Sequence, residues 1–185
     1  MSERLLAIDF GRTFGWCYDP YVKGMSGSIY LESDNEGHRY LQFHRWLQMQ
    51  FNQGLNHVSY ERPIGYHQPI TIKPFAFYEC TVLMMCACYN VSFSCTYPST
   101  LKAYTTGSGK ADKKDMIKTI QRIIPDLELM DDNHCDAVAI WLWGNDNEAQ
   151  ADEVKRIKDL KEKKAADRNK KSAEKKAAKN QKKLF

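Results

Sequence analysis

The sequence predicts an α/β domain in which helices cover a mixed sheet, and two observations lead to this fold class. Short apolar or alternating runs, typical of strands, come first along the chain, at residues 4–10, 16–18 and 26–31. Strand-like runs at 56–61 and 91–97 then alternate with longer segments of helical periodicity. Strands followed by an alternation of strands and helices are typical of an α/β sandwich with a mixed sheet.

The first three strands are expected to form a meander that leads into a helix. Gly11 and Gly15 are expected to bracket the turn after the first strand. Ser33 and Asp34 are both good N-caps for the helix, and Glu36 stands three residues after Ser33, as in a capping box. Apolar residues at helical spacing then continue up to the next glycine, which suits the end of a helix.

The second half of the domain is expected to add three or more helices. A proline-rich loop is predicted over 62–74, followed by a helix over 75–89. Pro98 can start a short helix, because proline suits the first helical turn. Asp112 can cap a further helix, and the last helix of the core is predicted over about 132–145.

Three acidic residues stand where apolar runs begin or end. Asp9 and Glu61 each follow a strand-like run, and Asp136 opens an apolar stretch that is better read as a buried helix. Carboxylates at strand ends and on a packed helix can converge on one point. Hard divalent cations such as Mg²⁺ and Mn²⁺ prefer oxygen ligands of this kind. The residues themselves therefore favour a metal-dependent phosphodiesterase.

Charge is divided unevenly along the chain, whose net charge is +4. Residues 151–185 hold 14 Lys and Arg against 6 Asp and Glu, whereas residues 1–150 hold 13 basic and 17 acidic side chains. The last segment also has few apolar residues to bury. We therefore predict a folded domain over 1–147 and a Lys-rich tail over 148–185 that is either helical or disordered.

The six cysteines are expected to be free thiols, and the protein is expected to make no contact with a membrane. Cys86 and Cys88 are too close together for a zinc knuckle, and no partner pair stands at zinc spacing. The longest apolar stretch, residues 82–89, is too short to span a bilayer. These features predict a cytoplasmic protein in a reducing compartment.

Four blocks of sequence stand in a recognisable order: LLAIDFGRTFGW at 5–16, VSYERP at 58–63, YPSTLKAYTTGSGKADKKDM at 97–116 and DDNHCDAVAIWLW at 131–143. In order and spacing they resemble the RuvC-type Holliday junction resolvases of the phage kind, members of the RNase H-like superfamily. The resemblance implies a five-stranded mixed sheet with helices on both faces. If the protein is encoded by a phage, its cytoplasm is that of the bacterial host.

The resemblance also assigns roles to the three acidic residues. Asp9 matches the catalytic aspartate of the family's first strand, and Glu61 matches the glutamate of its fourth strand. Asp136 matches the aspartate that precedes alanine in the final helix. These residues are implied to be both catalytic groups and metal ligands.

The fourth ligand of the family is where this sequence departs from the pattern. The family has an acidic residue or a histidine three positions before Asp136, and Asn133 stands there instead. Asp132 lies four positions before Asp136 and so shares its helical face. We therefore expect Asp132 to be the fourth catalytic and metal-binding carboxylate, with Asn133 as an auxiliary oxygen donor. His134 points elsewhere on an ideal helix and is the less favoured candidate.

The implied reaction is the paired cleavage of Holliday junctions and related branched DNA, including forks and flaps, which leaves 5′-phosphates. Two Mg²⁺ or Mn²⁺ ions about 4 Å apart can activate a water and stabilise the leaving 3′ oxygen. Asp9 is expected to bridge the ions, with Glu61 and Asp136 on either side. A homodimer is implied, because a four-way junction requires two symmetric cuts.

Basic residues near the third block are expected to contact DNA. Lys102 and Lys113 match basic positions near the scissile backbone in the family, and Lys110 and Lys114 flank them. Tyr66 could stack on an unpaired base at the junction. The basic tail is interpreted as a nonspecific DNA tether rather than a solubilising appendage, because the rest of the chain is net acidic.

Two other functions were weighed against the nuclease. The run from Asp9 to Thr13 also resembles the phosphate-binding turn of actin-like sugar kinases, but the chain is too short for their two domains and lacks their second glycine-rich motif. The alternative that stays open is a non-catalytic junction-binding protein of the same fold. It would be favoured if the missing acid at Asn133 left the second metal unbound.

Overall fold

The computed structural model describes residues 4–62 and 69–146, and within these ranges it contains a five-stranded mixed sheet. The strands lie in the order β3-β2-β1-β4-β5. β1 pairs antiparallel with β2, which pairs antiparallel with β3, whereas β4 runs parallel to both β1 and β5. Their bounds are β1 Leu5–Asp9, β2 Thr13–Cys17, β3 Ser26–Tyr30, β4 His57–Glu61 and β5 Ser92–Thr96.

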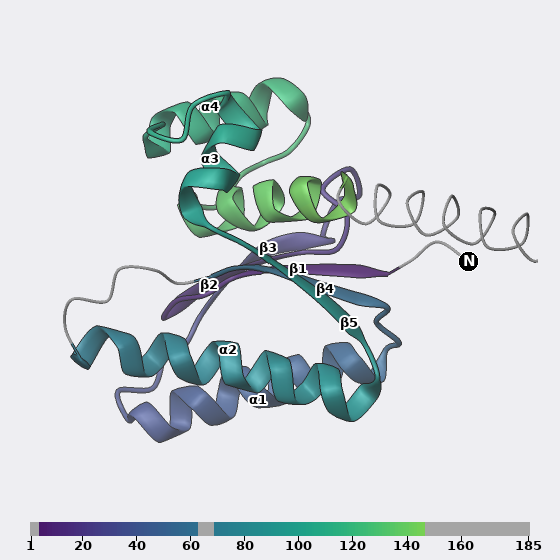
Figure 1. The fold of residues 1–185 in the computed structure, drawn as a ribbon, viewed down its shortest axis with the longest axis vertical. Coiled ribbons are helices and arrows are strands. Elements are labelled where there is room, and N and C mark those ends of the chain that lie inside the picture. Colours follow the sequence, from purple (N-terminus) through teal and green to yellow (C-terminus); the bar gives the residue numbers. More distant parts are fainter. Residues whose placement is uncertain (1–3, 63–68, 147–185) are drawn as a thin grey trace, which may run out of the picture. The chain divides into compact units, whose positions relative to one another are not determined.

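Helices cover both faces of this sheet, so the predicted fold class is confirmed (Figure 1). α1 and α2 lie on one face, and a helix over residues 132–146, called here the final helix, lies on the other with α3 and α4 beyond it. No helix in the described ranges is long and apolar enough to cross a membrane. The bounds of the labelled helices are α1 Glu36–Asn52, α2 Pro69–Tyr89, α3 Pro98–Thr106 and α4 Lys113–Ile123.

The central strand β1 is buried on both sides and separates two apolar cores. Leu6 and Ile8 point toward α1 and α2, where they join a large aromatic cluster. Ala7, between them, packs with Val138 and Ile140 of the final helix. Successive side chains of a strand point to opposite faces of the sheet, and a strand covered on both faces reads as a continuous apolar run. All six cysteines are free, as predicted.

Two predicted boundaries in the first half differ from the structure. β2 begins at Thr13, so Gly15 lies inside this strand rather than in the preceding turn. The N-cap of α1 is Asn35, whose side chain accepts a hydrogen bond from the backbone N–H of His38 at 3.0 Å. Ser33 instead accepts a hydrogen bond from the backbone N–H of Asn35, and it stands two residues before the N-cap position.

The second helix is longer than its sequence indicates. α2 begins at Pro69, six residues before the predicted start, and it contains Pro74. Pro69 suits the first helical turn, where its missing N–H has no partner in any case. Pro74 lacks one backbone hydrogen bond but leaves the helix continuous here. The predicted loop over 62–74 is therefore wrong from residue 69 onward, where the helix begins.

Candidate active site

Asp9 and Glu61 end two neighbouring parallel strands. Ile8 of β1 lies opposite Tyr60 of β4, so the next residue on each strand is acidic. Parallel strands place their carboxyl ends at the same edge of the sheet. The two carboxylates therefore stand side by side, in the arrangement that the apolar runs before them predicted.

Close packing against β2 brings the final helix to this edge. Gly15 lies opposite Asp9 in the antiparallel pair of β1 and β2. A Cβ on Gly15 would overlap the backbone carbonyl of Asn133 and would lie 2.9 Å from the Cβ of Ala137. The absent side chain lets the first turn of the final helix touch the strand, and this contact carries Asp136 into the neighbourhood of Asp9.

The three acidic residues repel one another in a partly desolvated site. Burial, and then the charges of Asp136, Glu61 and Asp132, raise the pKa of Asp9 well above its ordinary value. Burial and the charge of Asp136 raise the pKa of Glu61 to about 7. Burial and the charge of Asp132 raise the pKa of Asp136 to about 6. A cluster of carboxylates with raised pKa values in one place is typical of functional sites.

Asp132 behaves differently from the other three acids. Its carboxylate accepts a hydrogen bond from the ammonium group of Lys113, and this bond lowers its pKa. Its charge nevertheless contributes to the raised pKa values of Asp9 and Asp136. The structure therefore brings all four predicted acidic residues into one electrostatic neighbourhood.

The chemistry of this donor set fits a hard divalent cation. Buried carboxylates whose mutual repulsion raises their pKa values are relieved by a bound cation, and oxygen is the donor that Mg²⁺ and Mn²⁺ prefer. Within the described ranges, however, no three acidic, His or Cys side chains form a group that is already arranged to hold an ion. The four side chains thus share a region without a preformed coordination shell.

His134, the less favoured candidate, faces β3 instead of the acidic residues. Its side chain is 2% exposed. Its Nδ1 accepts a hydrogen bond from the backbone N–H of Met130 at 3.2 Å, so its Nε2 carries the proton and donates to the Ser26 hydroxyl at 2.8 Å. Burial lowers the pKa of His134, as expected for a neutral ring. Next to it, Asp131 accepts hydrogen bonds from the Ser28 hydroxyl at 2.6 Å and from the backbone N–H of His134 at 2.8 Å.

These positions give different expectations for neighbouring substitutions. We expect Asp132→Asn to lower cleavage of branched DNA by orders of magnitude, because it removes a carboxylate from the acidic site. Asn133→Ala and His134→Ala should lower cleavage much less, when rates are compared at a temperature at which each variant is folded. Rates under single-turnover conditions, with thermal unfolding of each variant as a control, provide the measurement. A larger loss in His134→Ala than in Asp132→Asn would contradict the assignment.

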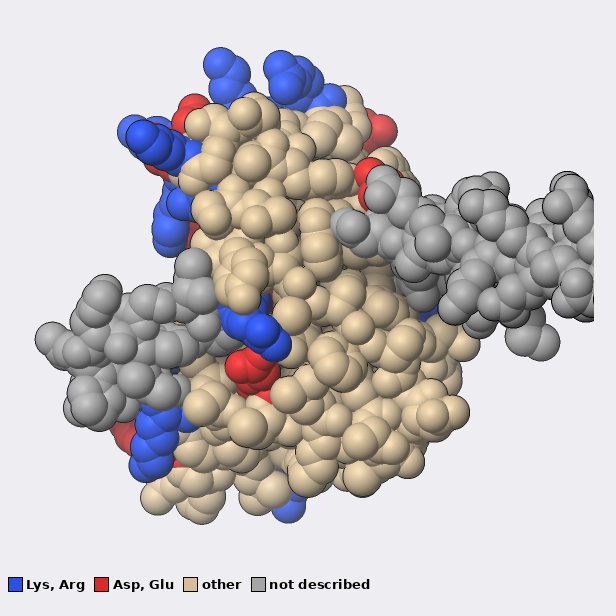
Figure 2. All heavy atoms as spheres, in the orientation of Figure 1, with Lys and Arg blue, Asp and Glu red and all other residues tan. Residues whose placement is uncertain are grey.

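The predicted DNA-binding lysines fall into two groups. The charges of Lys102, on α3, and Lys113, at the start of α4, act on the carboxyl groups of the site. Lys110, which precedes α4, and Lys114, which lies on α4, are both exposed. Figure 2 shows acidic side chains next to basic ones near the middle of one face, with further basic side chains over the region of α3 and α4. Tyr66 lies outside the described residues.

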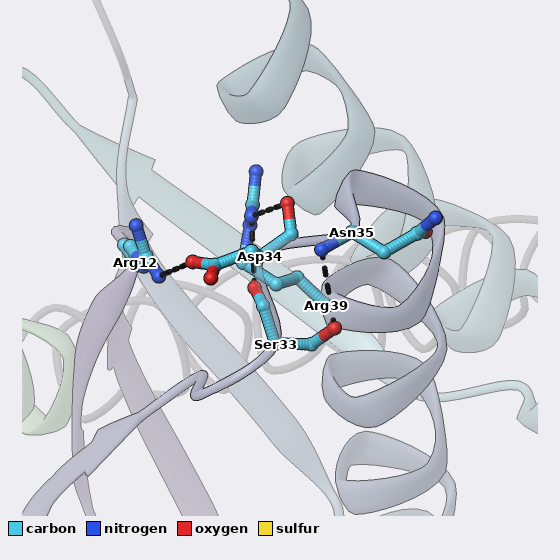
Figure 3. Close-up of polar contacts among 5 residues, drawn as sticks. All are labelled: Arg12, Ser33, Asp34, Asn35 and Arg39. Carbon is cyan, nitrogen blue, oxygen red and sulfur yellow. Dashed lines mark hydrogen bonds and ion pairs between the residues drawn. The ribbon is translucent and has the colours of Figure 1, made fainter.

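A polar cluster that the sequence did not indicate joins the turn after β1 to the start of α1 (Figure 3). The guanidinium of Arg12 forms an ion pair with Asp34 at 3.1 Å. Arg39 donates hydrogen bonds to the backbone carbonyls of Ser33 and Asp34, both at 2.9 Å. The ion pair links the turn that begins two residues after Asp9 to the segment before α1. No local pattern could have revealed the ion pair, because Arg12 and Asp34 lie 22 positions apart in sequence.

The raised pKa of Glu61 predicts how stability depends on pH in the absence of metal. Because its pKa rises from 4.5 to about 7 on folding, the folded protein holds this proton more tightly than the unfolded chain does. The resulting stabilisation is complete below pH about 4.5 and disappears as the pH rises through about 7. We expect Glu61→Gln to raise the free energy of unfolding by about 2 kcal/mol at pH 8 and much less at pH 5.

Urea denaturation in EDTA at the two pH values would measure this difference. Glu128→Gln, at an exposed position, is the matched control and should change stability little at either pH. Equal stabilisation by Glu61→Gln at both pH values would show that repulsion among the acidic residues is not its cause.

The fold and the site together define a class of protein. In this class an α/β fold places carboxylates at the ends of β1 and β4 and on the final helix. No protein-family model and no curated protein sequence matches the chain. Solved structures do match. RuvC of Thermus thermophilus has a TM-score of 0.56 at 20% identity, over 74% of this chain and 89% of that one.

Two further solved structures share the fold. T. thermophilus RuvC in complex with a Holliday junction substrate has a TM-score of 0.58 at 20% identity, over 75% of this chain and 90% of that one. The yeast mitochondrial Holliday junction resolvase Ydc2 has a TM-score of 0.54 at 13% identity, over 75% and 76%. The chain has the RuvC fold, which confirms the expected resemblance at the level of architecture.

Proposed function

We propose that this protein is a metal-dependent endonuclease that resolves Holliday junctions and related branched DNA by paired cuts that leave 5′-phosphates. The observation that carries the proposal is the grouping of Asp9, Glu61 and Asp136 at one edge of a RuvC-like sheet, with Lys102 and Lys113 beside them. A binding protein without catalysis would not need mutually repelling, partly buried carboxylates, which lower its stability.

The acidic and basic side chains of the site would have different roles in cleavage. Asp9, Glu61, Asp132 and Asp136 would hold one or two Mg²⁺ or Mn²⁺ ions. Such ions supply Lewis-acid chemistry at the scissile phosphate and an activated nucleophile. Lys102 and Lys113 place positive charge beside the carboxylates, where a phosphate of the DNA backbone would otherwise be repelled. Lys110 and Lys114, exposed nearby, would extend this contact along the strand.

The homodimer that two symmetric cuts require is supported by an exposed apolar surface on α2 and β5. Met84 is 53% exposed and Phe93 is 46% exposed. Phe93 also lines a hollow together with Leu83, Ala87 and Val91. Exposed apolar side chains that lie together are typical of protein–protein contacts. We propose that two copies of the chain associate through this surface, which sedimentation equilibrium of Met84→Glu against the wild type would test.

Cleavage of a synthetic four-way junction across a titration of Mg²⁺ and Mn²⁺ tests the proposal directly. The expected result is paired nicks with 5′-phosphate ends, dependent on metal, with little cleavage of linear duplex of the same sequence. Tight junction binding without cleavage at any metal concentration would favour the alternative, a non-catalytic junction-binding protein of this fold.

The Lys-rich segment 148–185 lies outside the described residues, and we propose that it tethers the protein to DNA. Truncation after Asn147 should weaken binding to duplex and junction alike and flatten the dependence of affinity on salt. Each lost phosphate contact removes about 0.9 from the logarithmic slope, so three or four are measurable by fluorescence anisotropy. Cleavage at saturating enzyme should survive, because all four acidic residues precede the cut. An unchanged slope would identify the segment as an appendage.

A further inference from the structure

We propose that Lys113 forms an ion pair with Asp132 while no divalent ion is bound, and that this ion pair breaks when a divalent ion binds. Metal binding would then free the ammonium group to contact a DNA phosphate. The inference rests on the proposed metal-dependent function. It adds that binding of the metal ion and binding of DNA are coupled through Lys113.

The ion pair itself is the first observation. Lys113 Nζ donates a hydrogen bond to Oδ2 of Asp132, and the two side chains are 74% and 38% exposed. Among the residues that the structure describes, Asp132 is the one member of the four acidic residues with a lysine at ion-pair distance. An exposed ion pair of this kind contributes little to stability, so a competing cation can replace it.

The position of Lys113 is the second observation. It is the first residue of α4, where a capping box between Asp112 and Asp115 fixes the backbone. The ammonium group stands at the end of a flexible four-carbon stem. The side chain can therefore turn away from Asp132 without any movement of the helix that carries it.

The other acidic residues explain why exchange would matter. The charge of Lys113 also acts on Asp9 and Asp136, so the ammonium group partly neutralises these two carboxylates as well as that of Asp132. A divalent ion held by these carboxylates would replace that charge and repel the ammonium group. A lysine displaced beside a scissile phosphate is available to bind it. Coupling of this kind is reciprocal: metal must strengthen DNA binding as much as DNA strengthens metal binding.

Metal affinity without DNA gives the first test. Isothermal titration calorimetry with Mn²⁺ should show about twofold to fivefold tighter binding to Lys113→Met than to the wild type, the range expected for loss of one exposed ion pair. Lys118→Met, on the exposed surface of the same helix, is the matched control and should match the wild type. In an Asp132→Asn background, Lys113→Met should have a clearly smaller effect, because only the longer-range charge of Lys113 on Asp9 and Asp136 is then removed.

Three results would overturn the inference. Unchanged Mn²⁺ affinity in Lys113→Met would exclude competition. An equally large effect in the Asp132→Asn background would show that Lys113 acts only through long-range charge and not by exchange at Asp132. Absence of Mn²⁺ binding to the wild type would remove both this inference and the metal-dependent function, whereas either of the first two results leaves that function intact.

Junction affinity gives a second, independent test of the coupling. In fluorescence anisotropy, Ca²⁺ should strengthen binding of the junction to the wild type more than to Lys113→Met, relative to EDTA. The Lys118→Met protein should respond to Ca²⁺ as the wild type does. Equal strengthening in the wild type and in Lys113→Met would contradict the release of Lys113 toward phosphate.

Discussion

Replacing Asp9 by asparagine should abolish junction cleavage while junction binding persists. The substitution keeps the size of the side chain but removes one negative charge from the centre of the acidic site, where Asp136, Glu61 and Asp132 all act on it. Loss of a metal-binding carboxylate forfeits several kcal/mol of transition-state stabilisation, about a thousandfold in rate. The lysines that would contact phosphate are unchanged, so affinity for the junction should stay close to that of the wild type.

Single-turnover cleavage and anisotropy on the same junction would measure both quantities. Asp126→Asn, at an exposed position outside the acidic site, is the matched control and should retain full activity. Because repulsion in the site is relieved, Asp9→Asn should also unfold at a higher temperature than the wild type at pH 8 in EDTA. Wild-type cleavage by Asp9→Asn would remove Asp9 from the catalytic group.

Replacing Gly15 by alanine should have the second large effect, on folding. The added methyl group would overlap the backbone carbonyl of Asn133, which belongs to a helix and cannot rotate away as a side chain can. The strand and the final helix would have to separate, at a loss of about 3 kcal/mol in the free energy of unfolding. Since the same helix carries Asp132 and Asp136, the folded remainder should also cleave poorly.

The control is Gly27→Ala on the neighbouring strand β3. There the nearest atom to an added Cβ is the sulfur of Met130, 3.3 Å away at the end of a flexible side chain. Chemical denaturation should show a change of about 1 kcal/mol or less for Gly27→Ala. If Gly15→Ala is no less stable than Gly27→Ala, the close approach of helix and strand does not hold the site together.

The parts of the site that could be predicted are those with a local cause. Asp9 and Glu61 follow buried strands of unmistakable apolar character, and the parallel pairing of β1 and β4 then places them together. The N-cap at Asp112 could likewise be predicted, because aspartate is a favoured residue at the start of a helix. The final helix could be predicted from the apolar run after Asp136, which is too long for a typical strand.

The parts that could not be predicted depend on contacts between distant segments. Gly15 was interpreted as a turn residue, since glycine is common in turns, and its close contact with Asn133 has no signature in either segment. The N-cap of α1 was placed on Ser33 or Asp34, because three consecutive residues are all good caps. The start of α2 was missed because two prolines outweighed the apolar pattern that follows them.

The hydrogen bonds that anchor the final helix on β3 also determine when the acidic site is completed. They join residues 103 and 108 positions apart, namely Ser28 with Asp131 and Ser26 with His134. Contacts of such long range form slowly, because a long loop must close first. During synthesis, the strand bearing Asp9 leaves the ribosome long before the helix bearing Asp136. A nascent chain would therefore hold only Asp9 and Glu61, half of the acidic site, until nearly the whole domain had been made.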